Sequence, residues 1–110
     1  NCTAKMIEES AIKFIEVIRK AHPTTPIIML DSYKFPPSQF NLVQRRQLEE
    51  KTVEMKKVAE HFKRDKNFYF YEGESYNDDE CSVDGAHLTD LGFKAMADHY
   101  KKLLKKFIRK

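Results

Sequence analysis

The chain has 110 residues, of which 41% are apolar and 34% charged, and its net charge is +3. This length supports one domain or part of one, and a content of 12% aromatic residues with only three Gly excludes disordered and collagen-like chains. The 20 basic and 17 acidic residues are spread along the chain, which argues against a nucleic-acid binder, and no apolar run approaches the ~20 residues of a membrane span. Because the first residue is Asn1 and not Met, we expect the chain to begin after a processing point or inside a larger gene product.

The first expected element is a helix between Thr3 and His22. Thr3 is a suitable N-cap, and the helix should end before Pro23, because the residue before a proline disfavours helical conformation. The apolar positions recur at helical spacing; they are Ile7, Ala11, Phe14 or Ile15, and Ile18. The apolar run 27–30 that follows predicts a strand buried on both faces.

A proline-containing loop over 33–41 separates this strand from a second expected helix. Its apolar positions lie four and three residues apart; they are Leu48, Thr52, Met55, Ala59 and Phe62. The aromatic run 68–71 predicts a second strand. After an acidic loop, Thr89 caps a third helix. The expected buried face of that helix is Phe93, Met96, Ala97, Tyr100, Leu103 or Leu104, and Phe107.

The predicted order α-β-α-β-α contains one right-handed parallel βαβ unit. Helices on both faces of such a sheet give a three-layer α-β-α arrangement, the flavodoxin-like doubly wound fold. A parallel sheet of two strands leaves edges without partners. We therefore expect the chain to form part of a doubly wound domain.

Polar clusters are expected at the carboxyl ends of the strands, where ligands bind in this fold class. Asp31 and Ser32 follow the first strand, and Asp84 and His87 follow the second with Gly85 between them. This spacing lets the carboxylate accept from imidazole Nδ1–H while Nε2 faces the cleft, the base-and-orienter pair of acyl transfer. On spacing alone, the same pair is also typical of turn or cap residues.

The run from Val83 to Phe93, Val-Asp-Gly-Ala-His-Leu-Thr-Asp-Leu-Gly-Phe, resembles the terminal block of the SGNH/GDSL serine hydrolases. That block supplies two members of the family's catalytic triad. Leu88 stands where proline is common, a departure that bears on the turn more than on the chemistry. Asn1-Cys2-Thr3, followed directly by a helix, resembles the family block in which an Asn side chain donates to the oxyanion hole; the likeness is to the bacterial branch of these esterases.

The resemblance implies that residues 1–110 are the C-terminal part of a single SGNH hydrolase domain. The family's nucleophilic Ser lies in a Gly-Asp-Ser block, which is absent from this chain, so the N-terminal remainder is the implied partner and the isolated chain should be inactive. The implied reaction is hydrolysis of a small acyl ester, for example an acetyl or carbohydrate ester, with His87 as general base, Asp84 orienting it and Asn1 at the oxyanion hole. Asp31 and Ser32 become residues of the cleft wall. Neither a metal nor an organic cofactor is implied, and family members of this branch are often periplasmic or secreted.

Several alternatives stay open from the sequence. The chain could be a non-catalytic α/β binding module in which Asp84 and His87 cap the last helix. His22, His61 and His99 are interpreted as surface or packing residues. The lysines of the last helix are interpreted as a solvated cationic face, and a membrane or phosphate surface is the rival. Cys2 and Cys81 are interpreted as free thiols, with a disulfide as the alternative.

Overall fold

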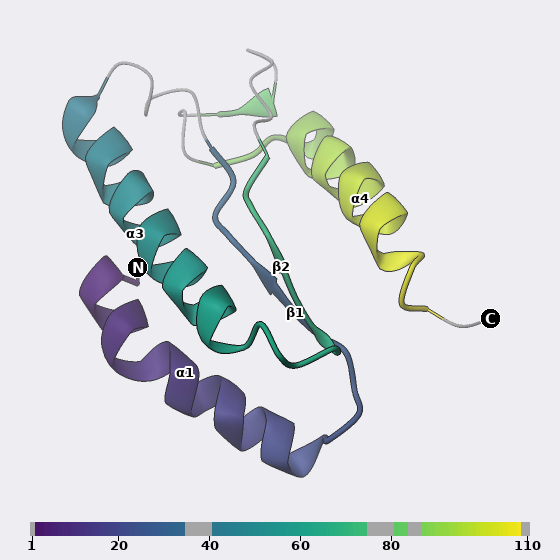
Figure 1. The fold of residues 1–110 in the computed structure, drawn as a ribbon. Coiled ribbons are helices and arrows are strands. Elements are labelled where there is room, and N and C mark those ends of the chain that lie inside the picture. Colours follow the sequence, from purple (N-terminus) through teal and green to yellow (C-terminus); the bar gives the residue numbers. More distant parts are fainter. Residues whose placement is uncertain (1, 35–40, 75–80, 84–86, 109–110) are drawn as a thin grey trace.

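The structure, a computed structural model, describes residues 2–34, 41–74, 81–83 and 87–108. Its elements are α1 (Ala4–Ala21), β1 (Ile27–Leu30), α3 (Leu42–His61), β2 (Phe68–Tyr71) and α4 (Asp90–Leu104). Figure 1 shows α1 and α3 side by side on one side of the strands, with α4 on the other side. The predicted element order and the mixed α/β class are confirmed.

The two strands form a parallel sheet at the predicted residues. Ile27 pairs with Phe68 and Leu30 with Tyr71. The ladder extends one residue before β2, where the Ile27 N–H donates to the Asn67 carbonyl at 2.8 Å, and one residue past β1, where the Asp31 N–H donates to the Tyr71 carbonyl at 3.0 Å. Since α3 connects the strands, β1-α3-β2 is the expected βαβ unit, and both strands end at the same edge of the sheet.

Each helix begins at a polar cap. Thr3 Oγ1 accepts from the Met6 N–H at 3.2 Å, and Thr89 Oγ1 accepts from the Gly92 N–H at 3.2 Å, as predicted. Asn41 caps α3 through its side-chain oxygen. The prediction that α4 continues to Phe107 is wrong, because the helix ends at Leu104; the Phe107 ring still packs on Tyr69, with ring centroids 4.6 Å apart.

The core contains one buried aliphatic residue from each helix. Ile15 of α1, Val58 of α3 and Leu103 of α4 are buried, together with Leu88 and Cys81 near the start of α4. The sequence left open whether Phe14 or Ile15, and whether Leu103 or Leu104, is buried. Ile15 and Leu103 are the buried members of these pairs. Val58 was missed, because the predicted stripe of α3 passed through its neighbours at positions 55 and 59.

Two burial predictions are wrong. β1 is not buried on both faces, since three of its residues are half-buried and Leu30 is exposed. Phe93 and Ala97 of α4, expected in the core, are exposed, and Phe93 is 58% exposed. The physical reason is that no further layer of the described chain covers these surfaces. The accessible surface is 8356 Å², against about 6,300 Å² for a folded monomer of this mass, and the radius of gyration is 15.4 Å, against about 13 Å for a compact domain.

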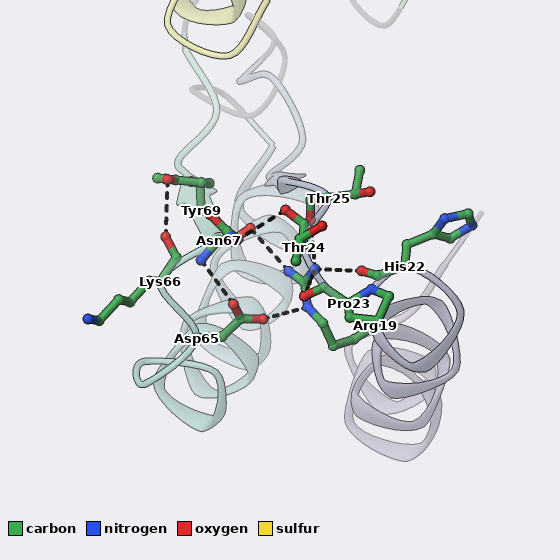
Figure 2. Close-up of polar contacts among 9 residues, drawn as sticks. All are labelled: Arg19, His22, Pro23, Thr24, Thr25, Asp65, Lys66, Asn67 and Tyr69. Atoms are coloured by element: carbon green, nitrogen blue, oxygen red, sulfur yellow. Dashed lines mark hydrogen bonds and ion pairs between the residues drawn. The ribbon is translucent and has the colours of Figure 1, made fainter.

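The amino ends of the strands are held together by Arg19 of α1 (Figure 2). Arg19 Nε donates to Asp65 Oδ2 at 2.8 Å, and its Nη2 donates to the Asn67 carbonyl at 3.2 Å. Its Nη1 donates to the carbonyls of His22 and Thr25, at 2.8 and 2.7 Å, and to that of Pro23 at 3.3 Å. One half-buried guanidinium therefore joins the loop before β1 to the loop before β2.

Replacing this guanidinium should destabilise the fold even when the charge is kept. We expect Arg19→Lys to lower the free energy of unfolding by about 2 kcal/mol, because an ammonium cannot reproduce the fork of donors. The measurement is urea denaturation.

Arg46→Lys is the matched control, since Arg46 pairs with Glu50 one turn along α3 and both side chains are exposed. Its expected effect is below about 0.5 kcal/mol. Equal effects of the two substitutions would contradict the assignment of the Arg19 network as the anchor of the strands.

Candidate active site

The described candidate residues gather at the edge of the sheet where both strands end. Asp31 and Ser32 directly follow β1. Residues 81–83 and the start of α4, next to His87, lie at the same end in Figure 1. Asn1 and Asp84 fall outside the described residues, so their roles beside His87 stay predictions.

His87 lies on a segment that is paired with residues 81–83 by backbone hydrogen bonds. Ser82 and Leu88 form an antiparallel bridge. The His87 carbonyl accepts from the Val83 N–H at 2.9 Å and from Ser82 Oγ at 3.1 Å, and the Thr89 N–H donates to the Cys81 carbonyl at 3.0 Å. The segment on the carboxyl side of His87 is therefore fixed by its backbone.

The burial of Leu88 explains why the His87 side chain faces outward. Successive side chains of an extended segment point to opposite sides. Leu88 is buried and His87 is exposed. An exposed imidazole on an anchored backbone is accessible to a substrate.

The start of α4 approaches Cys81 closely at Gly92. A Cβ atom at this position would lie 2.3 Å from the Cys81 carbonyl oxygen and about 3 Å from the Leu88 side chain. Only glycine allows the first turn of α4 to pack this closely on the backbone that pairs with residues 87–89. Helical periodicity alone does not single out this glycine for close packing.

Gly92→Ala should therefore be destabilising, although alanine normally favours a helix over glycine. We expect a loss of about 1–3 kcal/mol in the free energy of unfolding, because the methyl group clashes with backbone that must then move. Thermal or urea denaturation measures the change. The exchange Ala97→Gly on the exposed face of α4 is the control, with a loss of about 1 kcal/mol from helix propensity alone. An alanine at 92 that stabilises the protein would contradict the close packing.

Asp31 is a buried carboxylate that links β1 to α3. Its Oδ1 accepts from the Ser32 N–H at 2.8 Å, and its Oδ2 accepts from the Thr52 hydroxyl at 2.6 Å. The sequence placed Thr52 on the inner face of α3 but did not identify it as a partner of Asp31. These two bonds satisfy a group that burial would otherwise penalise.

A cavity of about 450 Å³ lies beside Asp31 and Ser32. Its wall is completed by α3 and by Glu72, which follows β2. Lys56 Nζ of α3 contacts Glu72 Oε1 at 2.6 Å, and this hydrogen bond holds the pKa of the Glu72 carboxyl below its usual value of 4.5. The cavity lies at the predicted edge; that Asp31 and Ser32 line the catalytic cleft stays a prediction.

The remaining histidines and the cysteines have ordinary surroundings. His61 Nε2 lies 3.4 Å from Glu16 Oε1, and the His99 ring packs against Tyr100. Cys2 is exposed and Cys81 buried, and both are free thiols, so the disulfide alternative is not what the structure contains. On the last helix, Lys94 pairs with Asp98 at 2.8 Å.

Two negative observations apply to the described part of the chain. None of its helices is both long and apolar enough to cross a membrane. The same residues contain no group of three or more His, Cys, Asp or Glu side chains placed to hold a metal ion.

One structural feature near His87 was missed from the sequence. Ser82 was not singled out, although the Asp84-Gly85 dipeptide is a known hairpin signal. Reading that signal would have paired Ser82 and Val83 with the residues around His87. The backbone partners are Val83 with His87 and Cys81 with Thr89, four and eight residues apart, and side-chain periodicity does not reveal such pairs.

Comparison with known proteins gives one family. The model of the GDSL-like lipase/acylhydrolase family matches residues 1–105. A crystal structure of a protein from Bacteroides ovatus, assigned as a GDSL-like lipase, is similar with a TM-score of 0.88 and 30% sequence identity. The match covers 97% of this chain but 33% of the other, so this chain spans about a third of its length. Comparison with curated protein sequences finds no match.

Proposed function

The chain belongs to the GDSL-like lipase/acylhydrolase family, and we propose that it supplies the general base of an ester hydrolase through His87. The observation that carries the proposal is the exposed His87 on a backbone-anchored segment at the carboxyl edge of the sheet, within the family match. The family match favours this function over a non-catalytic binding module. It supports a hydrolase of the esterase or lipase kind.

In the proposed mechanism, a serine Oγ attacks the ester carbonyl carbon while its proton passes to His87 Nε2. Asp84 accepts from His87 Nδ1–H, which fixes the tautomer and stabilises the imidazolium. The side-chain amide of Asn1 donates to the oxyanion. His87 then returns the proton to the departing alcohol, and a water molecule repeats the sequence on the acyl-enzyme, releasing the acid and restoring the serine.

The proposed substrate is a small acyl ester, for example an acetyl ester of a carbohydrate. The cavity beside Asp31 and Ser32 supports a binding site at this edge, because about 450 Å³ is within the usual range of small-molecule sites. Charged groups on its wall, among them the Lys56–Glu72 pair, would contact a polar alcohol portion. Asp31 and Ser32 are proposed as wall residues of this cleft.

We also propose that residues 1–110 form the C-terminal part of one hydrolase domain, and that the N-terminal part contributes the nucleophilic serine. Exposed apolar side chains support the proposal, because the N-terminal part could form a further layer that covers them. Met6, Phe14 and Val17 share one face of α1, and Phe93 and Leu104 share one face of α4. The surplus of about 2,000 Å² of accessible surface over a folded monomer equals a large interface. The completed domain would be a three-layer, flavodoxin-like α-β-α sandwich.

The role of His87 predicts a large loss of activity on substitution. In the complete hydrolase, His87→Ala should lower kcat/KM for p-nitrophenyl acetate at least about 1,000-fold, because the substitution removes the proposed acceptor of the serine proton. His61→Ala is the matched control, since this exposed histidine of α3 pairs with Glu16, and we expect its activity within about twofold of the parent. Comparable activity of the two variants would disprove the role of His87.

The absence of a nucleophile predicts that the isolated 110-residue chain is inactive. We expect no hydrolysis of p-nitrophenyl acetate above the level of the His87→Ala form of the same chain, because a base without a nucleophile gives little acyl transfer. Progress curves measured at equal protein concentration test this. Sustained turnover that disappears in His87→Ala would show that the chain contains its own nucleophile.

A further inference from the structure

We propose that Ser82 is a positioning residue for His87, acting through the backbone of the histidine and not through its ring. The inference rests on the proposed role of His87 as general base. It assigns a task to a serine that lies outside the Asp-x-x-His motif. The ester chemistry itself does not require a serine at this place.

Two hydrogen bonds meet at the carbonyl group of His87. The oxygen of His87 accepts from the Val83 N–H at 2.9 Å and from the Ser82 hydroxyl at 3.1 Å. Two donors from adjacent residues fix the plane of the peptide that joins His87 to Leu88. The Val83 bond belongs to the antiparallel bridge between Ser82 and Leu88, whose second bond runs from the Thr89 N–H to the Cys81 carbonyl at 3.0 Å.

The position of this peptide matters because the exposed His87 directly precedes residues that are held by burial and by hydrogen bonds. After it, Leu88 is buried and Thr89 is bonded to Cys81 and caps α4. The His87 side chain itself is exposed. Packing therefore holds the residues after His87, while the Ser82 hydroxyl adds a side-chain donor at the carbonyl of His87.

A general base must come within about 2.6–3.2 Å of the proton that it accepts. When the His87 carbonyl is held, the Cα atom of His87, which lies in the same peptide plane, is held with it. The imidazole then adjusts through rotation about the Cα–C bond and through its two side-chain torsions. When the Ser82 hydroxyl is lost, the Val83 bond still closes the segment, so the fold should survive with a looser peptide plane. Small displacements of a catalytic group lower kcat more than KM, because they affect the transition state and not ground-state binding.

The test compares Ser82→Ala, Ser82→Thr and Ser82→Val in the complete hydrolase with p-nitrophenyl acetate. Threonine keeps the hydroxyl, and valine has nearly the same shape without it; both suit an extended segment. We expect the alanine and valine variants to lose about tenfold in kcat with KM within about twofold, and threonine to restore kcat to within about twofold of the parent. Ser10→Ala is the matched control, because Ser10 also donates a hydroxyl to a backbone carbonyl, that of Met6 in α1.

Titration of active sites with a fluorophosphonate separates positioning from misfolding. The proposal predicts a full complement of reactive sites in every Ser82 variant and a lower rate per site in Ser82→Ala and Ser82→Val. Parental kcat in these two variants, failure of threonine to rescue, or a loss explained by fewer reactive sites would each overturn it.

His87→Ala in the same series separates the two proposals. If this variant is inactive while Ser82→Ala retains parental kcat, the role of Ser82 fails and the proposed function stands. If His87→Ala is itself active, both proposals fail.

Discussion

The arrangement of the sheet depends on one guanidinium group. The Asn67 carbonyl accepts both from Arg19 Nη2 and from the Ile27 N–H, which is the first bond of the parallel ladder. Arg19 thus reaches from the last turn of α1 to the point where the register of β1 against β2 begins (Figure 2). Asn67 Nδ2 adds a second link to the loop before β1 by donating to the Thr24 carbonyl at 3.2 Å. A parallel pair of only four residues per strand would otherwise have few contacts to specify its register.

The same register determines how β1 and β2 end at the carboxyl edge of the sheet, where the candidate site lies. Each strand rises about 3.3 Å per residue, so four paired residues bring the ends of β1 and β2 to the same level. There the Asp31 carboxylate bonds to Thr52 of α3, and Gly92 lets α4 pack on Cys81. The Gly92 contact and the backbone hydrogen bonds to residues 81–83 hold the segment that contains His87. The contacts of Arg19 at the amino edge of the sheet and the position of the exposed His87 at its carboxyl edge therefore depend on the same strand register.

Local sequence signals predicted the elements well, whereas tertiary burial was harder to predict. Thr3 and Thr89 were identified as caps because a cap depends on bonds within one turn. Burial of Phe93 was predicted wrongly because periodicity identifies an apolar face without showing what covers it. The Asp-x-x-His motif drew attention to His87, but the Ser82 hydroxyl and the Gly92 contact depend on the pairing of two segments in space. Such partners are not encoded in the spacing along one helix or strand.

We propose that this chain holds the general base and that the nucleophilic serine lies elsewhere in the complete hydrolase. Labelling that enzyme with a fluorophosphonate and mapping the modified peptide locates the nucleophile. The modified serine is expected to lie outside residues 1–110. Modification of a serine within the chain, such as the exposed Ser32 next to Asp31, would contradict it.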